Sequence, residues 1–66
     1  MTIKYQGKDE TTSATTVAAF LAEKGVNVKT AIVEYGGGIY GADSDLSALA
    51  VAEGAELNVF NIVSGG

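Results

Sequence analysis

Apolar and polar side chains alternate at the beginning of the chain. Met1, Ile3 and Tyr5 are separated by polar residues, and this period of two predicts a half-buried β-strand that starts at the first residue. Gly7 can adopt the positive φ that a tight hairpin requires. We therefore expect a returning strand over residues 8–12, whose polar composition predicts a place on the outside or at the edge of a sheet.

The apolar period changes in the next segment. Over residues 17–21 apolar side chains recur at i, i+3 and i+4, which predicts the buried stripe of an amphipathic helix. A threonine before the stripe, Thr15 or Thr16, is expected to cap the helix N-terminus through its hydroxyl. Gly25 is placed to end the helix in a left-handed conformation.

The second half of the chain predicts further short strands. A run of three glycines breaks an alternating segment, and acidic residues then precede a short apolar stretch that suits a capped helical turn. A β-prone segment follows. We expect strands at residues 31–35, 39–40 and 57–63, with the helical turn at 43–50. The order of hairpin, helix, short strands and final strand predicts an α+β domain over residues 1–63, followed by a flexible Ser-Gly-Gly tail at 64–66.

Composition excludes several classes of chemistry. The chain has no Cys and no His, which removes a thiolate nucleophile, an iron–sulfur cluster and a zinc site of the usual kind. Four Lys face eight acidic residues, for a net charge of −4, and no basic stripe for nucleic acid is present. No apolar run reaches the length of a membrane span, and no secretory signal is visible. We expect a cytoplasmic protein with no nucleic-acid or membrane partner.

The ending of the sequence is the strongest candidate for chemistry. Val63, Ser64, Gly65 and Gly66 follow the last predicted strand directly. Two glycines without Cβ atoms would form a thin arm that can enter a narrow channel in another protein. A carboxylate on Gly66 is ionised at neutral pH and a poor electrophile, but adenylation by ATP would make it open to attack by sulfur. The alternative is that the glycine ending is incidental.

The sequence also resembles a known family over nearly its whole length. The resemblance rests on Gln6-Gly7 at the first turn, the helix segment Thr16-Val17 to Phe20-Leu21, the stretch Gly54 to Leu57 and the ending Ile62 to Gly66. These features resemble the ThiS family, the sulfur carriers of thiamine biosynthesis. The resemblance implies a β-grasp, ubiquitin-like fold with a central C-terminal strand.

The resemblance further implies a function in sulfur transfer. The chain would be a co-substrate, not an enzyme, and would bind no cofactor itself. A ubiquitin-activating-type enzyme would use ATP to adenylate Gly66, a cysteine-derived sulfur donor would convert it to a thiocarboxylate, and thiazole synthase would take up the sulfur. The chain departs from the family at Ala55, where an Asp is frequent, and at Gly41-Ala42, where a Pro-Arg pair is common.

Three other functions stay open at this point. The small subunit of molybdopterin synthase has similar tail chemistry, although such chains tend to be longer and to carry prolines before the ending. A ubiquitin-like modifier would instead form amide links from Gly66 to lysines. A purely structural or designed domain would make no use of the tail.

Alternation in the last strand predicts a contact surface. If Leu57, Val59 and Val63 face the helix, then Phe60 and Ile62 point to the opposite face, and the same parity places Ile32 beside them. An apolar patch on an open sheet face usually marks a contact surface, so these residues are expected to dock partner enzymes. If the strand parity slips, they belong to the core instead.

Two further patterns have simpler explanations. The spacing Gly36-x-Gly38-x-x-Gly41 matches a dinucleotide-binding motif, but that motif works only between a strand and a long helix, so we expect a hairpin loop. Four acidic residues also lack the spacing of a calcium loop, and we expect them to cap helices and face solvent. They are Asp43, Asp45, Glu53 and Glu56.

Overall fold

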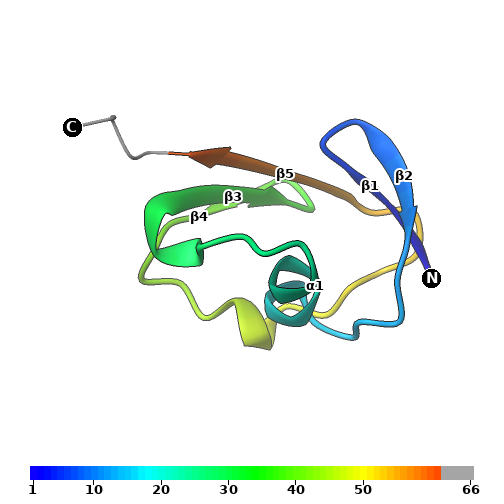
Figure 1. Ribbon diagram of the computed structural model, residues 1–66, viewed down its shortest axis with the longest axis horizontal. Coiled ribbons are helices and arrows are strands. Elements are labelled where there is room, and N and C mark those ends of the chain that lie inside the picture. The colour runs from blue at the N-terminus through cyan, green and yellow to red at the C-terminus, as the bar shows by residue number, and fades with distance from the viewer. Residues whose placement is uncertain (62–66) are drawn as a thin grey trace.

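The computed structural model describes residues 1–61 of the chain. This part is a compact α+β domain with one α-helix, two 3₁₀ turns (η1 and η2) and a five-stranded mixed sheet (Figure 1). The elements in chain order are β1 (Thr2–Tyr5), β2 (Lys8–Thr11), α1 (Val17–Glu23), η1 (Val28–Thr30), β3 (Ala31–Tyr35), β4 (Gly38–Tyr40), η2 (Leu46–Ala48) and β5 (Glu56–Asn61).

The predicted N-terminal hairpin is present. β1 and β2 pair antiparallel, with Tyr5 opposite Lys8. The two residues between them, Gln6 and Gly7, both have positive φ, at 52° and 83°, which is the geometry of a type I′ turn. β2 ends at Thr11, one residue earlier than predicted. Thr12 is buried, its N–H still donates to the carbonyl of Met1 at 2.8 Å, and its hydroxyl accepts a hydrogen bond from the N–H of Ala14.

Helix α1 is capped at both ends as the sequence predicts. Of the two candidate threonines, Thr16 is the N-cap, and its hydroxyl accepts from the backbone N–H of Ala19 at 3.1 Å. At the other end Gly25 has a φ of 71° and donates to Ala22. The following amide, of Val26, donates to Leu21 at 3.0 Å, which completes a Schellman motif.

The last strand lies in the centre of the sheet. The strand order is β2-β1-β5-β3-β4, and β5 is parallel to β1 and antiparallel to β3. Its pairing with β3 is continuous from Leu57, opposite Tyr35, to Asn61, opposite Ala31. At its beginning β5 therefore pairs with both β1 and β3. Beyond Leu57 it pairs with β3 as far as Asn61, its last described residue.

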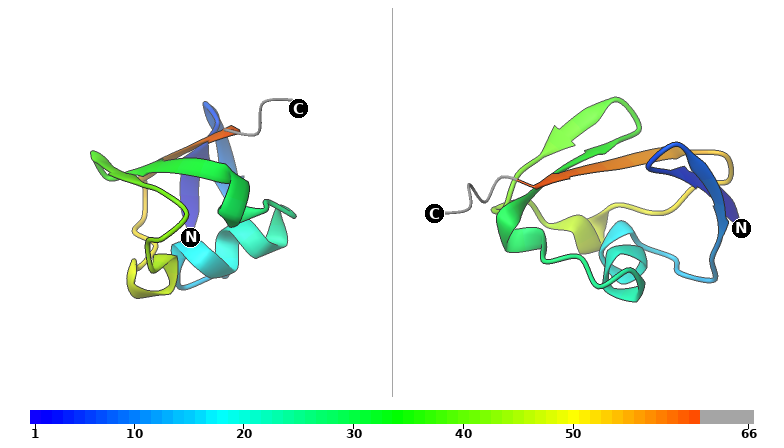
Figure 2. Two further views of the ribbon diagram at one scale, coloured as in Figure 1. Left: turned by 90° about the vertical axis from the view of Figure 1, so that its left-hand side faces the viewer. Right: turned by 45° about the horizontal axis from the view of Figure 1, so that its top comes forward.

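The core lies between the sheet and the helical segments. α1 and both 3₁₀ turns pack on one face of the sheet (Figure 2). Among the described residues, no helix covers the other face, which we call the outer face. The core consists mainly of Ile3 from β1, Val17, Phe20 and Leu21 from α1, Val33 and Tyr35 from β3, Leu46, Val51, and Leu57 from β5.

The glycine motif is a hairpin, as expected. Gly36 and Gly37 form the turn between β3 and β4, both with positive φ, and Gly38 already belongs to β4. The chain continues from Gly41 into a loop and the short turn η2, so the strand-to-long-helix junction of a dinucleotide site is not formed here.

Candidate functional site

The residues of the predicted tail are beyond the part that the structure describes. These are Val63, Ser64, Gly65 and Gly66, together with Ile62 of the predicted contact surface. Their roles stay predictions. The structure does describe the strand that leads to them, since β5 ends its described part at Asn61, still opposite Ala31 of β3.

Phe60 and Ile32 are brought together on the outer face. They lie directly opposite each other in neighbouring strands β5 and β3, and facing side chains of such a pair are in contact range. Leu57 in the same strand is completely buried, whereas Phe60 is 55% exposed. The predicted parity is thus confirmed for Leu57, Phe60 and Ile32, and Phe60 is not a core residue. For Ile62 and Val63, which lie outside the described residues, it stays a prediction. Its role in docking stays a prediction.

The outer face has a third apolar residue that sequence reasoning missed. Ile39 of β4 is 72% exposed and lies opposite Glu34, the residue two positions along β3 from Ile32 and therefore on the same face. The sequence contains the necessary alternation, but the register between β3 and β4 decides which face Ile39 joins. We refer to Ile32, Ile39 and Phe60 together as the outer patch.

One acidic side chain lies beside the outer patch, and a second lies further along β5. The Glu34 carboxylate accepts a hydrogen bond from the Asn58 side chain at 2.9 Å, which fixes it between the strands that carry the patch. Glu56 is exposed at the start of β5, opposite Lys4 of β1. A partner for this face would therefore combine an apolar centre with a basic residue near Glu34.

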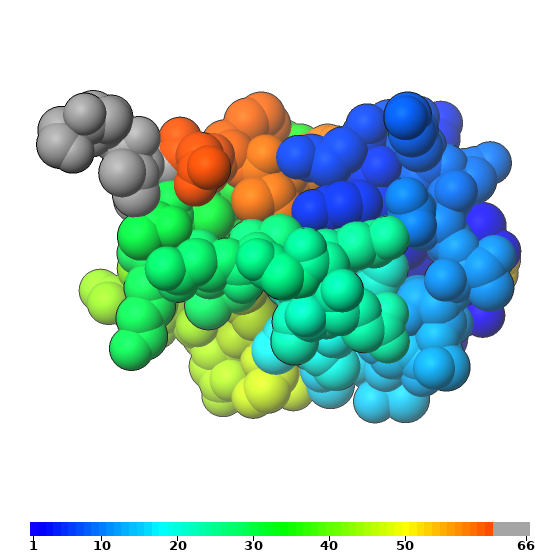
Figure 3. Space-filling model, viewed as in Figure 1, coloured from blue at the N-terminus to red at the C-terminus, as the bar shows by residue number. Residues whose placement is uncertain are grey.

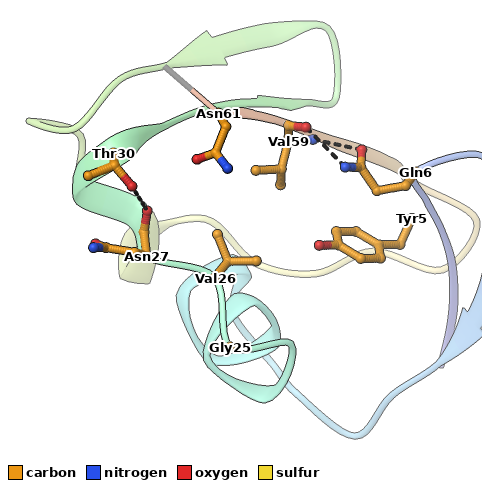
Figure 4. A pocket seen from close by; sticks show the side chains of 8 residues that line it. All are labelled: Tyr5, Gln6, Gly25, Val26, Asn27, Thr30, Val59 and Asn61. Atoms are coloured by element: carbon orange, nitrogen blue, oxygen red, sulfur yellow. Dashed lines mark hydrogen bonds between the residues drawn. The ribbon is translucent and has the colours of Figure 1, made fainter. Parts of the chain in front are cut away.

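A groove lies on the opposite side of β5, beneath the end of the strand. Its volume is about 510 Å³, and it runs between β5 and the segment that links α1 to β3, which are seen one above the other in Figure 3. In Figure 4 the side chain of Asn61 and the ring of Tyr5 point toward the groove. The lining residues are Tyr5, Gln6, Gly25, Val26, Asn27, Thr30, Val59 and Asn61.

Gln6 makes the most specific contact at this groove. Its side-chain nitrogen donates to the carbonyl of Val59 at 3.0 Å, and its side-chain oxygen accepts from the N–H of Val59 at 2.9 Å (Figure 4). Sequence reasoning assigned Gln6 only to the hairpin turn. No local signal could have found this contact, because the two residues are 53 positions apart.

A second groove, of about 250 Å³, lies between α1 and η2. It is mostly apolar and has no charged group except the carboxylate of Asp45, which caps η2 by accepting from the N–H of Ser47. Nothing in this arrangement suggests a reaction. Its lining residues are Ala18, Ala22, Val26, Val28, Ser44, Asp45, Leu46 and Ser47.

The acidic residues do not gather into a metal site in the described part of the chain. Within residues 1–61 there is no group of three or more side chains that could hold a metal ion. Asp45 acts as a cap, as expected, and Glu53 accepts a hydrogen bond from the backbone N–H of Thr2 at 3.0 Å. In the same part of the chain, no helix has the length and apolar character needed to cross a bilayer.

Comparison with known proteins adds no assignment. No protein-family model matches the chain, and no curated protein is similar enough to count as a match. The interpretation of function therefore rests on the sequence and on the geometry of β5, the outer patch and the groove.

Proposed function

We propose that this protein is a sulfur carrier of the β-grasp, ubiquitin-like fold whose reactive group is the carboxylate of Gly66. The single observation that carries the proposal is the continuity between the central strand β5 and the sequence Ser64-Gly65-Gly66. An acyl group that must be presented to several enzymes in turn is best carried on a slender segment that begins at a rigid part of the fold.

The topology supports the β-grasp part of the proposal. In that fold a hairpin, a helix and further strands form a mixed sheet in which the last strand lies beside the first. Here β5 is parallel to β1 and lies between β1 and β3, and α1 covers one face. The ThiS-type resemblance of the sequence is in agreement with this arrangement.

The proposed chemistry is a two-step activation. An oxygen of the Gly66 carboxylate attacks the α-phosphorus of ATP in a partner enzyme, and pyrophosphate leaves. A thiol of excess cysteine releases hydrosulfide from the donor's persulfide as a disulfide forms. The hydrosulfide then attacks the carbonyl carbon and displaces AMP, and loss of its proton leaves a thiocarboxylate. The protein is a co-substrate in these steps, and thiazole synthase is the proposed acceptor. Because activation uses ATP, we place the protein in the cytoplasm.

The outer patch is the proposed docking surface for the adenylating enzyme. Phe60, Ile32 and Ile39 supply the apolar contact, and the neighbouring Glu34 would attract a basic residue of the partner. Phe60 lies in the strand that leads to Gly66, so docking there would bring the tail toward the partner's active site.

Intact mass spectrometry tests the proposal directly. The protein is incubated with ATP, a cysteine desulfurase, L-cysteine and an adenylating enzyme of the ubiquitin-activating type. Replacement of one oxygen by one sulfur supports a carrier. Amide conjugates to other chains would support a protein modifier instead, and an unchanged mass would contradict both. Sulfur transfer to thiazole synthase or to the large subunit of molybdopterin synthase distinguishes the two acceptor pathways.

The proposal also predicts strict dependence on the final residue. Removing Gly66, or adding one residue after it, should abolish thiocarboxylate formation, because the activated carboxyl would be displaced by one residue from the partner's catalytic groups. The same variants should keep the thermal unfolding midpoint of the parent protein, since β5 and the core are unchanged. Equal sulfur delivery by either variant would contradict the proposal.

A further inference from the structure

Gln6 has a backbone conformation that its residue type does not favour. It occupies the first position of the two-residue turn with a φ of 52°. Such a position requires positive φ and is usually filled by Asn, Asp or Gly. A residue keeps a strained conformation only when contacts with its surroundings hold it there, and such residues are often found at functional sites.

Contacts of the Gln6 side chain with β5 explain why Gln occupies this position. Its carboxamide donates to the carbonyl of Val59 at 3.0 Å and accepts from the N–H of Val59 at 2.9 Å, in place of the two backbone groups that a longer neighbouring strand would offer. The backbone N–H of Gln6 also donates to the carbonyl of Leu57 at 3.0 Å. Backbone and side chain of one residue thus bind two successive positions on the same edge of β5.

The Gln6 side chain extends the hydrogen bonding along this edge of β5 beyond the last residue of β1 that pairs with it. β1 pairs with β5 only as far as Tyr5, opposite Leu57, and the chain then turns back into β2. Without the Gln6 carboxamide, the N–H and carbonyl of Val59 would face the open groove. Asn, the residue that suits the turn better, is one methylene shorter and would not span the same distance.

We propose that Gln6 is a positioning residue that holds the end of β5 in the sheet and so fixes the point from which the segment carrying Gly66 extends. This inference rests on the proposed function. With the contact in place, the end of β5 is paired with β3 on one side and bonded at Val59 to Gln6 on the other. A partner enzyme then binds a strand end that is already ordered.

Loss of the contact should affect the binding of partners more than their chemistry. If Val59 to Asn61 are held by β3 alone, more backbone freedom must be lost when the tail enters the partner. The KM for this protein in the adenylation reaction should therefore rise, while kcat, which depends on the atoms at Gly66, should not change.

The variant Gln6→Asn separates this role from the role of Gln6 in the turn. Asn favours the turn conformation, so the thermal unfolding midpoint should stay the same or rise. The hydrogen-exchange rate of the Val59 amide should nevertheless increase about fivefold, as expected for the loss of one ordinary hydrogen bond. In the adenylation assay the KM should increase about threefold or more, with kcat unchanged.

Two further variants serve as controls. Thr30→Val removes the hydrogen bond from the Thr30 hydroxyl to the Asn27 carbonyl in the same groove without touching β5, and should alter neither the exchange rate at Val59 nor the KM. Gln6→Glu keeps the reach and the acceptor but loses the donor, and should give intermediate values.

The outcomes separate the inference from the proposed function. An unchanged exchange rate at Val59 in Gln6→Asn, or an unchanged KM despite faster exchange, would overturn the inference while the parent protein is still adenylated normally. A parent protein that is not adenylated at all would contradict the proposed function itself, and with it the inference.

Discussion

Tyr35 and Phe60 are aromatic residues on opposite faces of the sheet, and their surroundings differ accordingly. Tyr35 points into the core, where its hydroxyl donates to the carbonyl of Ala50 at 2.8 Å and accepts from the N–H of Ala52 at 2.9 Å. It thereby ties β3 to the segment before β5, with both hydrogen-bonding functions satisfied. Phe60 has no polar group and lies on the outer face, where an exposed ring suits contact with another molecule.

At this scale the variant Phe60→Asp tests the proposed docking surface. Because the ring is already 55% exposed, the fold should stay intact and the loss of stability should be about 1 kcal/mol or less. Binding to the adenylating enzyme should weaken by about tenfold, which corresponds to about 1.4 kcal/mol. Calorimetric titration with the enzyme measures the affinity, and circular dichroism measures the unfolding.

The control for this variant is Ile39→Asp, which introduces the same charge at a more exposed position of the same face. We expect a smaller effect on binding, since β4 is an edge strand that β3 separates from the strand leading to Gly66. Loss of cooperative unfolding in Phe60→Asp would mean that the ring supports the core.

At the scale of elements, α1 depends on its ends and on the sheet. With seven residues it is too short to be stable alone in water. Burial of its apolar face and the hydrogen bonds at its two caps must supply the stability that so short a helix lacks by itself. The cap at Thr16 also connects it to the rest of the fold, since this residue forms an isolated β-bridge with Ala50, and the N–H of Val17 donates to the carbonyl of Leu49 at 2.9 Å.

Removing the N-cap should measurably destabilise the whole domain. Thr16→Ala deletes the hydroxyl that accepts from Ala19, and such a loss costs about 1 kcal/mol of unfolding free energy. Urea denaturation followed by circular dichroism measures the change. Thr15→Ala is the matched control, because the Thr15 side chain is exposed and α1 is capped by its neighbour. Equal losses in the two variants would contradict the assignment of the cap.

At the scale of the whole molecule, packing has to supply the stability. The chain has no cysteine for a disulfide, and a domain of this size buries a smaller fraction of its surface than a large one. A stability of roughly 0.05–0.15 kcal/mol per residue corresponds to about 3–10 kcal/mol for 66 residues. Central core residues therefore account for a large share of the total.

The small total stability of the domain should be most evident when Leu57 is replaced. It is completely buried in the central strand, and Leu57→Ala should cost about 2–5 kcal/mol, enough to leave a large unfolded population in a domain near the lower bound. Urea denaturation measures the loss, and the parent protein should unfold in one cooperative step. Addition of EDTA or a reductant should leave the parent midpoint unchanged. A loss below about 1 kcal/mol would mean that the core can rearrange around the cavity.

The sequence by itself determined the features that depend on neighbouring residues. The hairpin turn at Gln6-Gly7, the cap and Schellman ending of α1, and the alternation in β3 and β5 follow from local conformational preference and from the period of apolar residues. These signals lie within a few positions of one another. They could therefore be found without knowledge of the fold.

Tertiary structure alone decided how these elements pair and which side chains meet. Local signals did not distinguish Thr15 from Thr16 as the cap, did not assign Ile39 to the outer patch, and gave no indication that Gln6 binds Val59. The last two depend on the register between segments that are distant in sequence, and a register is set by the packing of a whole sheet face. The position of β5 between β1 and β3, on which the proposed function depends, is the largest feature of this kind. The family resemblance implies a central last strand, but no local pattern of residues does.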